Sequence, residues 1–215
     1  MLKWLGNLIN KFRGEAEHFH PEDLNDPIAL KTEWKPAKGG GASFQTHKLV
    51  KKSSNRIEFQ TSIGFKLFCL SFFLAGAICS IVFGYPMCAE TIGCLMPVII
   101  GMLFMGAGGG MYYFGAAPRI FDKRVGYYWK GRQDPSKVAR KKELKHWTRL
   151  DRIHALQLIS EYVKSDKSSY LSYEINLVLS DGGRINVVDH GKKSKVLEDA
   201  DILAEFLDVP VWNAI

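Results

Sequence analysis

Asp189-His190-Gly191 is the part of the sequence whose residue types come closest to a reaction centre. A histidine beside an aspartate at the end of a strand could act as a general base, with Ser160, Ser172 or Ser194 as the nucleophile. The sequence contains no nucleophile elbow, no phosphate-binding glycine loop and no recognised zinc spacing. We therefore interpret the tripeptide as a polar turn, and an enzyme centred on Asp189 and His190 remains an alternative.

A second group of residues has the chemistry of metal ligands. The segment His18–Pro27 contains His18, His20, Glu22 and Asp23. A His-x-His pair in a polar segment is a weak metal signal when no second ligand group is placed opposite it. We expect no metal and no other cofactor.

The four cysteines fall into two pairs. Cys88 and Cys94 bracket the sequence AETIG, and in an oxidising compartment they could form a disulfide; two free thiols are the alternative. Cys69 and Cys79 lie within an apolar stretch, where we expect them to be packing residues.

Two uncharged apolar stretches, Leu67–Tyr85 and Leu95–Ala117, occupy the middle of the chain. As helices with a rise of about 1.5 Å per residue, both match the thickness of a bilayer. Lys66 precedes the first stretch and basic residues follow the second, whereas the connecting loop has no Lys or Arg. By the positive-inside rule, the sequence predicts a transmembrane hairpin with both flanks in the cytoplasm.

Small residues recur four positions apart in both stretches, at Gly76, Ser80 and Gly84 and again at Gly106 and Gly110. Such stripes let helices approach closely in lipid. Either the two helices pack on each other, or the Gly106–Gly110 cluster docks a helix of another protein. Neither stretch contains an ionisable Asp, Glu, Lys, Arg or His, which argues against an ion or proton pathway.

The net charge of +7 is concentrated after the second apolar stretch. Arg119–Arg152 holds twelve Lys or Arg against four Asp or Glu. This juxtamembrane position favours contact with anionic lipid headgroups, although a solvated basic face is equally consistent with the pattern. The expected headgroup contacts are Lys137, Arg140, Lys141, Lys142, Lys145 and, from an amphipathic helix over residues 1–17, Trp4. We expect no nucleic-acid partner, because no RNA-binding or helix-turn-helix motif is present.

The elements divide the chain into five parts. After the amphipathic helix we expect a linker over 18–43 with a flexible joint at Lys38–Ser43, two strands within 44–62, the hairpin over 63–118, and the rest of the domain over 119–215. Leu171–Leu179 alternates apolar and polar residues, and Asp181-Gly182-Gly183 predicts a tight turn into a strand at Arg184–Asp189. Apolar residues at helical spacing predict a C-terminal helix over about 194–208.

Seven strands followed by one helix is the element order of a pleckstrin-homology-like (PH-like) domain. In this order, and in the segments LQLISEYV, EINLVLSDGGRINVVDHG and LAEFLDVPVW, the chain resembles bacterial membrane-anchored proteins with a PH-like domain, from about Phe44 to Trp212. The resemblance implies an α+β membrane protein whose two-helix transmembrane hairpin is inserted in a PH-like antiparallel β-barrel or sandwich capped by a C-terminal helix.

The resemblance brings no catalytic residues, because such domains usually bind lipids, peptides or proteins. We therefore expect a non-catalytic scaffold, assembly or regulatory module in the bacterial inner membrane. Its expected partners are membrane lipids and either another integral membrane protein or a second copy of the chain. An anionic-lipid-sensing peripheral module is the alternative binding function.

Overall fold

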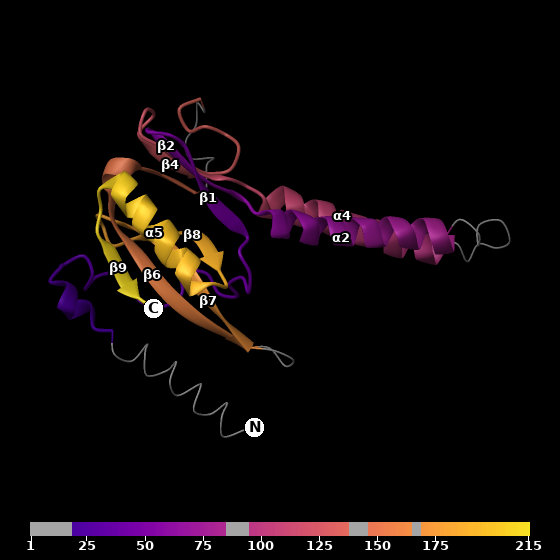
Figure 1. The fold of residues 1–215 in the computed structure, drawn as a ribbon, viewed down its shortest axis with the longest axis horizontal. Coiled ribbons are helices and arrows are strands. Elements are labelled where there is room, and N and C mark those ends of the chain that lie inside the picture. The colour runs from indigo at the N-terminus through magenta and orange to yellow at the C-terminus, as the bar shows by residue number, and fades with distance from the viewer. Residues whose placement is uncertain (1–18, 85–94, 138–145, 165–168) are drawn as a thin grey trace, which may run out of the picture. The chain divides into compact units, whose positions relative to one another are not determined.

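The computed structural model describes residues 19–84, 95–137, 146–164 and 169–215 (Figure 1). The chain forms two compact units, one made of Met1–Phe59 together with Arg119–Ile215 and the other of Gln60–Pro118. The described parts of the larger unit contain two β-sheets and one long helix, and those of the smaller unit contain two apolar helices. The architecture is therefore α+β, as the sequence predicts.

The first sheet has the strand order β1-β2-β3-β4-β5. Its strands are β1 (His47–Ser53), β2 (Arg56–Thr61), β3 (Arg119–Asp122), β4 (Tyr127–Lys130) and β5 (Trp147–Arg149). Strands β2 and β3 pair antiparallel, with Arg56 opposite Asp122 and Phe59 opposite Arg119. The segments before and after the apolar helices therefore belong to one sheet, and the helices are an insertion between two neighbouring strands.

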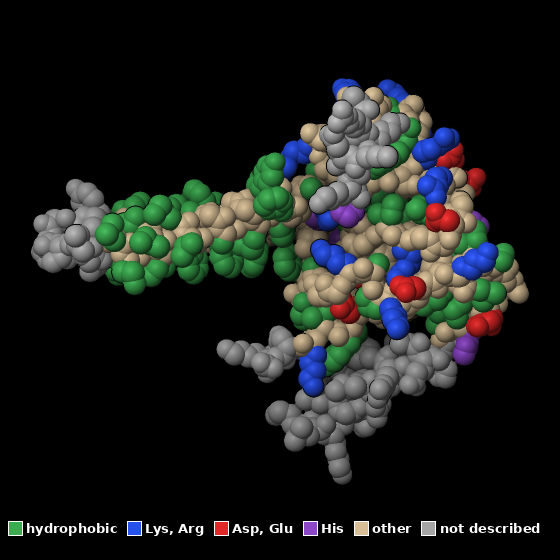
Figure 2. Space-filling model, turned by 180° about the vertical axis from the view of Figure 1, so that it is seen from behind, with side chains coloured by type: hydrophobic (Ala, Val, Ile, Leu, Met, Phe, Trp, Pro, Cys, Tyr) green, Lys and Arg blue, Asp and Glu red, His purple; other side chains and the backbone are tan. Residues whose placement is uncertain are grey.

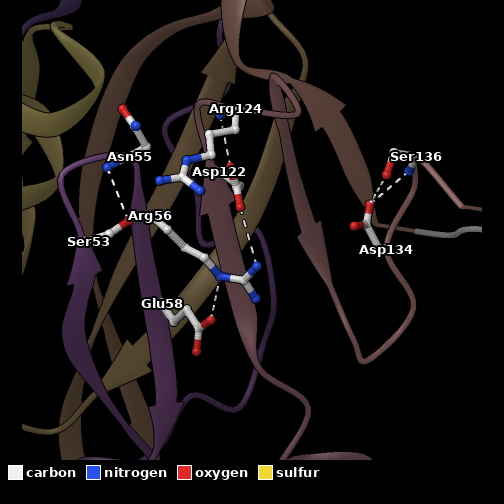
Figure 3. A network of polar contacts seen from close by, with 8 residues as sticks. All are labelled: Ser53, Asn55, Arg56, Glu58, Asp122, Arg124, Asp134 and Ser136. Atoms are coloured by element: carbon white, nitrogen blue, oxygen red, sulfur yellow. Dashed lines mark hydrogen bonds and ion pairs between the residues drawn. The ribbon is translucent and has the colours of Figure 1, made fainter.

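Arg56 connects strands β2 and β3 through its side chain (Figure 3). Arg56 donates from Nε to Glu58 at 2.7 Å and from Nη1 to Asp122 at 3.3 Å. The guanidinium also lies 5.7 Å from the ring centroid of Trp129 on β4. Asp122 accepts a further hydrogen bond from the backbone N–H of Arg124, so one cation connects three consecutive strands of the sheet.

The second sheet has the order β8-β7-β6-β9. It contains β6 (Ile153–Lys164), β7 (Ser169–Leu179), β8 (Arg184–His190) and β9 (Val211–Ala214). The predicted turn between β7 and β8 is confirmed, with Gly182 at φ 85°, a conformation that favours glycine. Strand β9 pairs in parallel with β6, which the sequence analysis does not predict.

Helix α5 (Lys193–Leu207) lies across the second sheet (Figure 1). Its predicted stripe enters the core, because Val196, Ala200 and Leu203 are fully buried. The helix ends where Asp208 adopts the left-handed conformation, two residues before Pro210. The main core joins this helix to both sheets, through side chains such as Phe59 and Phe121 of the first sheet and Leu158 and Ile175 of the second.

The two sheets do not close into a barrel within the described residues, so the barrel form of the expected fold is not found. Each sheet keeps its own edge strands, β1 and β5 in the first and β8 and β9 in the second. The short strands β5 and β9 are additions to the seven strands expected.

A linker was expected over residues 18–43. Its described residues, 19–43, pack on the second sheet. It begins with a short 3-10 helix, η1 (Pro21–Leu24), and Ala29 is fully buried beside Val178 and Trp212. The Trp34 ring lies 5.7 Å from that of Trp212. A linker was expected here, whereas the described segment covers the second sheet on a face separate from the main core.

The smaller unit contains α2 (Ile63–Ile78), which continues as the π-helical turn η2 (Cys79–Gly84), and α4 (Leu95–Gly115). Ser62 caps α2 by accepting a hydrogen bond from the Phe65 N–H at 3.1 Å. The helical stretches Ile63–Gly84 and Leu95–Gly115 have 22 and 21 residues, and both are long and apolar enough to cross a membrane.

Candidate functional site

The two apolar helices meet along a seam of small residues. A Cβ added to Gly101 would lie 2.5 Å from the Gly76 carbonyl oxygen, and one added to Gly108 would lie 2.8 Å from the Cys69 carbonyl oxygen. Real Cβ atoms do not approach other atoms this closely, so glycine is needed at both positions. Ser80 also lies in this seam beside Gly101. The close contact between helix backbones is typical of helix pairs packed in lipid.

The predicted small residues divide between this seam and the surface of α4. Gly76 and Ser80 lie in the seam, and Gly84 is buried in η2. A Cβ on Gly106 or Gly110 would meet nothing within 4 Å. At 100° per residue these two glycines lie about 140° and 180° around α4 from Gly101. They therefore form an open face on the side of α4 away from α2.

Many large apolar side chains are exposed along the hairpin (Figure 2). In the most apolar 18-residue segment of each helical stretch, only 17% and 11% is buried. The core helix of a soluble protein would be mostly buried. The exposed side chains include Leu67, Phe73, Ile81, Leu103 and Phe114. Such a continuous apolar surface is typical of a membrane or protein contact.

The larger unit contains a group of buried charged side chains centred on Arg119. Arg119 of β3 donates from Nε to the Val187 carbonyl of β8 at 2.8 Å, so it joins the two sheets. Its Nη1 contacts Nε2 of His47. Because a guanidinium only donates, Nε2 of His47 accepts, and the proton of that ring lies on Nδ1, which contacts the Thr46 hydroxyl at 3.0 Å.

Burial shifts the ionisation of this charged group. The pKa of the Arg119 guanidinium is lowered because burial disfavours its charge. Burial, with repulsion from Arg119 and Lys38, lowers the pKa of Lys130 to about 8, although Asp189 opposes this change. Burial also raises the pKa of the Tyr128 hydroxyl. Burial therefore disfavours the positive charge of both Arg119 and Lys130 in this group.

Two carboxylates of the second sheet hold the segment expected to be a flexible joint. Glu174 accepts the backbone N–H groups of Ala37 and Lys38 at 2.9 and 3.2 Å. Glu161 accepts those of Gly40 and Gly41, both at 3.0 Å. Glu174 is fully buried, and this burial raises its pKa despite three hydrogen bonds. These contacts order the backbone of the segment, because each carboxylate oxygen accepts a backbone donor.

The structure separates the parts of the candidate reaction centre. Adjacent strand residues point to opposite faces, and His190 pairs with Asp199 of α5 at 3.2 Å, whereas Asp189 accepts a hydrogen bond from Asn186. His190 is fully buried. Tyr173 of β7 pairs with His190 on one side and with Ser160 on the other. His190 and Ser160 are therefore two strand spacings apart, or about 10 Å. Among the described residues, the strand register therefore does not bring His190 and Ser160 together.

The remaining candidate serines are also placed elsewhere. The Ser172 hydroxyl donates to the Ala42 carbonyl at 3.1 Å, and Ser194 is exposed at the start of α5. Gly191 is required for packing, since a Cβ there would overlap the Ser43 backbone. Asp199, the partner of His190, was not found by sequence reasoning, because a helix residue nine positions away gives no periodic signal.

Among the residues that the structure describes, no group of His, Cys, Asp and Glu could hold a metal ion. His20, Glu22 and Asp23 are exposed, and His18 lies outside the described residues. Of the expected headgroup contacts, Lys137 is described and exposed. Trp4, Arg140, Lys141, Lys142 and Lys145 lie outside the described residues, as do Cys88 and Cys94 of the expected disulfide. Within the described part of the chain, Cys69 and Cys79 are free thiols.

No protein-family model, curated protein or solved structure matches the chain.

Proposed function

We propose that this chain is a non-catalytic integral membrane protein whose PH-like domain holds or regulates other components of a membrane complex. The exposed apolar surface of the hairpin is the observation that carries the proposal. Two helices of 22 and 21 residues leave most of their large apolar side chains uncovered. Lipid is the solvent in which such a surface is stable, whereas soluble proteins seldom expose one of this extent.

In this proposal the hairpin crosses the bacterial inner membrane with both of its ends in the cytoplasm. Lys66 near the start of α2 supports this orientation, and the exposed Tyr112 and Tyr113 near the end of α4 are suited to the membrane interface at the same end of the hairpin. Lysine is enriched on the cytoplasmic side and tyrosine at membrane interfaces. The loop between the helices then faces an oxidising compartment, where Cys88 and Cys94 form a disulfide.

The partner is another integral membrane protein or a second copy of the chain. Gly106 and Gly110 offer it a face of α4 that is not used by the hairpin seam. In the larger unit, His190 and Glu174 are engaged in internal contacts, which supports a binding function over a catalytic one.

The test begins with the tagged full chain in membranes of cells that express it at native levels. We expect the chain to resist carbonate extraction, and we expect Cys88 and Cys94 to react with a maleimide-polyethylene glycol only after reduction. Purification in mild detergent with mass spectrometry should then give a stoichiometric membrane partner, or a cross-linked dimer of the chain.

A double variant, Gly106→Leu with Gly110→Leu, should lose that partner. Ala75→Leu is the matched control, because it adds the same side chain at an exposed position of α2. Release of the wild-type chain by carbonate would overturn membrane insertion. Retention of the partner by the double variant would overturn the assignment of the interface.

A further inference from the structure

A groove of about 350 Å³ runs along one flank of the hairpin. Leu70 and Phe73 of α2 and Gly108, Gly109 and Tyr112 of α4 line it, together with Lys66. Lys66 is the first of these residues on α2 and Tyr112 the last on α4. Because the helices are antiparallel, both lie at the same end of the groove.

Glycine creates the open space of this groove. Gly108 lies in the seam, where a Cβ would touch the α2 backbone, whereas a Cβ on Gly109 would meet nothing within 4 Å. Gly109 lies about 80° around α4 from Gly101, and therefore on the flank of the seam. The two glycines therefore leave open space between Leu70 and Phe73 on α2 and Tyr112 on α4, and Cys69 also lines the groove.

The chemistry of the groove changes along its length. From Lys66 to Phe73 it spans seven residues of α2, or about 10 Å. The walls are hydrocarbon and aromatic apart from Cys69, and Lys66 is the one charged residue among the described residues that line the groove. An apolar slot with a cation at its mouth is complementary to an amphiphile that has an anionic head and a hydrocarbon tail.

We propose that the groove binds one acyl chain of an anionic phospholipid, whose phosphate is held by the Lys66 ammonium. The exposed Lys66 can extend to the headgroup level, as lysines near helix ends do, and the Tyr112 hydroxyl at the same end can donate to the phosphate or an ester oxygen. This inference rests on the membrane insertion proposed above. It is separate from the partner face at Gly106 and Gly110.

The experiment uses the full chain reconstituted in vesicles of equal parts phosphatidylcholine and phosphatidylglycerol. One of the two lipids carries a photoreactive diazirine in its acyl chain, and peptide mass spectrometry locates the adducts after illumination. We expect adducts on the peptides that contain Leu70, Phe73 and Tyr112. Phosphatidylglycerol should give about fivefold more adduct than phosphatidylcholine, as expected for one lysine near the membrane surface.

Two variants separate the tail site from the head site. Gly109→Leu fills the groove without touching the seam, so the adducts at these peptides should be lost for both lipids. Ala75→Leu is the matched control, because Ala75 is exposed on the side of α2 away from Leu70 and Phe73, and its adducts should equal those of the wild type. Lys66→Gln should keep the adducts but remove the preference for phosphatidylglycerol.

Three outcomes would overturn the inference. In the first, Gly109→Leu gives the same adduct yield as the wild type. In the second, the two lipids label the wild type equally. In the third, Gly109→Leu loses a cross-link to another protein and keeps its lipid adducts. Carbonate extraction of each variant identifies which proposal has failed. If the chain resists extraction but shows one of these outcomes, only the lipid-groove proposal is rejected. If carbonate extracts the chain, the proposal of membrane insertion is rejected.

Discussion

Replacing Lys130 by methionine should stabilise the protein at neutral pH. Lys130 of β4 is half-buried, and burial with repulsion from Arg119 and Lys38 lowers its pKa from 10.5 to about 8. At about 1.4 kcal/mol per pKa unit, holding this ammonium in the folded state costs about 3 kcal/mol. Some solvent screens the group, so we expect Lys130→Met to raise the free energy of unfolding by about 1–3 kcal/mol at pH 7.

The stabilisation should disappear as the pH rises. Below about pH 8 the lysine is charged in both the folded and the unfolded chain, so the full cost is present. Between about 8 and 10.5 the unfolded chain binds more protons than the folded one, and the stability of the wild type rises relative to that of the variant. Above 10.5 the residue is neutral in both states, and the difference caused by its charge is zero.

Urea unfolding of the full chain in detergent can measure this difference. Every tryptophan of the chain lies outside the apolar helices, so intrinsic fluorescence follows the larger unit. Lys52→Met, at an exposed position of β1, is the control and should change stability by less than about 0.5 kcal/mol at each pH. A Lys130→Met protein that is less stable than the wild type at pH 7, or a difference that is the same at pH 7 and 10.5, would refute the reasoning.

Three further predictions concern the seam and the buried polar contacts. Gly101→Val should destabilise the hairpin by about 1–3 kcal/mol, because its side chain would overlap the Gly76 backbone; detergent-titration circular dichroism should show this loss and no loss for Gly106→Val. Glu174→Gln leaves one backbone N–H of the covering segment without its acceptor, so unfolding should require about 1–3 kcal/mol less and amide hydrogen exchange at Ala37 should accelerate. His190→Ala should lower the melting temperature, because Asp199 loses its hydrogen bond to His190. The amount of membrane partner that co-purifies per folded molecule should be unchanged. Loss of a cellular activity at normal protein level would instead support the enzyme alternative.

The sequence predicts elements whose pattern is local. Alternation in β7 places Ile175 and Leu177 in the main core, as the structure confirms. The opposite face of the same strand was expected to be the polar side. There, Ser172, Glu174 and Asn176 are fully buried, and the segment over 37–42 covers Ser172 and Glu174. A backbone that packs on a distant strand leaves no periodic signal, so this burial could not be predicted.

The helix seam illustrates the same limit. Small residues four apart indicated a helix contact, but Gly101 and Gly108, which are seven apart, form it on α4. Seven residues are close to two helical turns, so both spacings keep residues near one face. With several glycines on each side of α4, only the position of α2 decides which of them are covered. Strands β5 and β9 were missed because three or four residues are too few to establish a period.

The hairpin replaces the turn between β2 and β3, and this explains how the domain forms one sheet from distant segments. Phe59 and Arg119 are opposite each other in the sheet, although the whole hairpin separates them in sequence. Closing a flexible loop of this length would cost conformational entropy. Two antiparallel helices bring the ends of the insertion together, and the Thr61 hydroxyl donates to the Ala116 carbonyl at 3.1 Å where the helices begin and end. Packing of the seam therefore offsets the entropy of joining β2 to β3, which lets a long apolar insertion occupy the place of a tight turn.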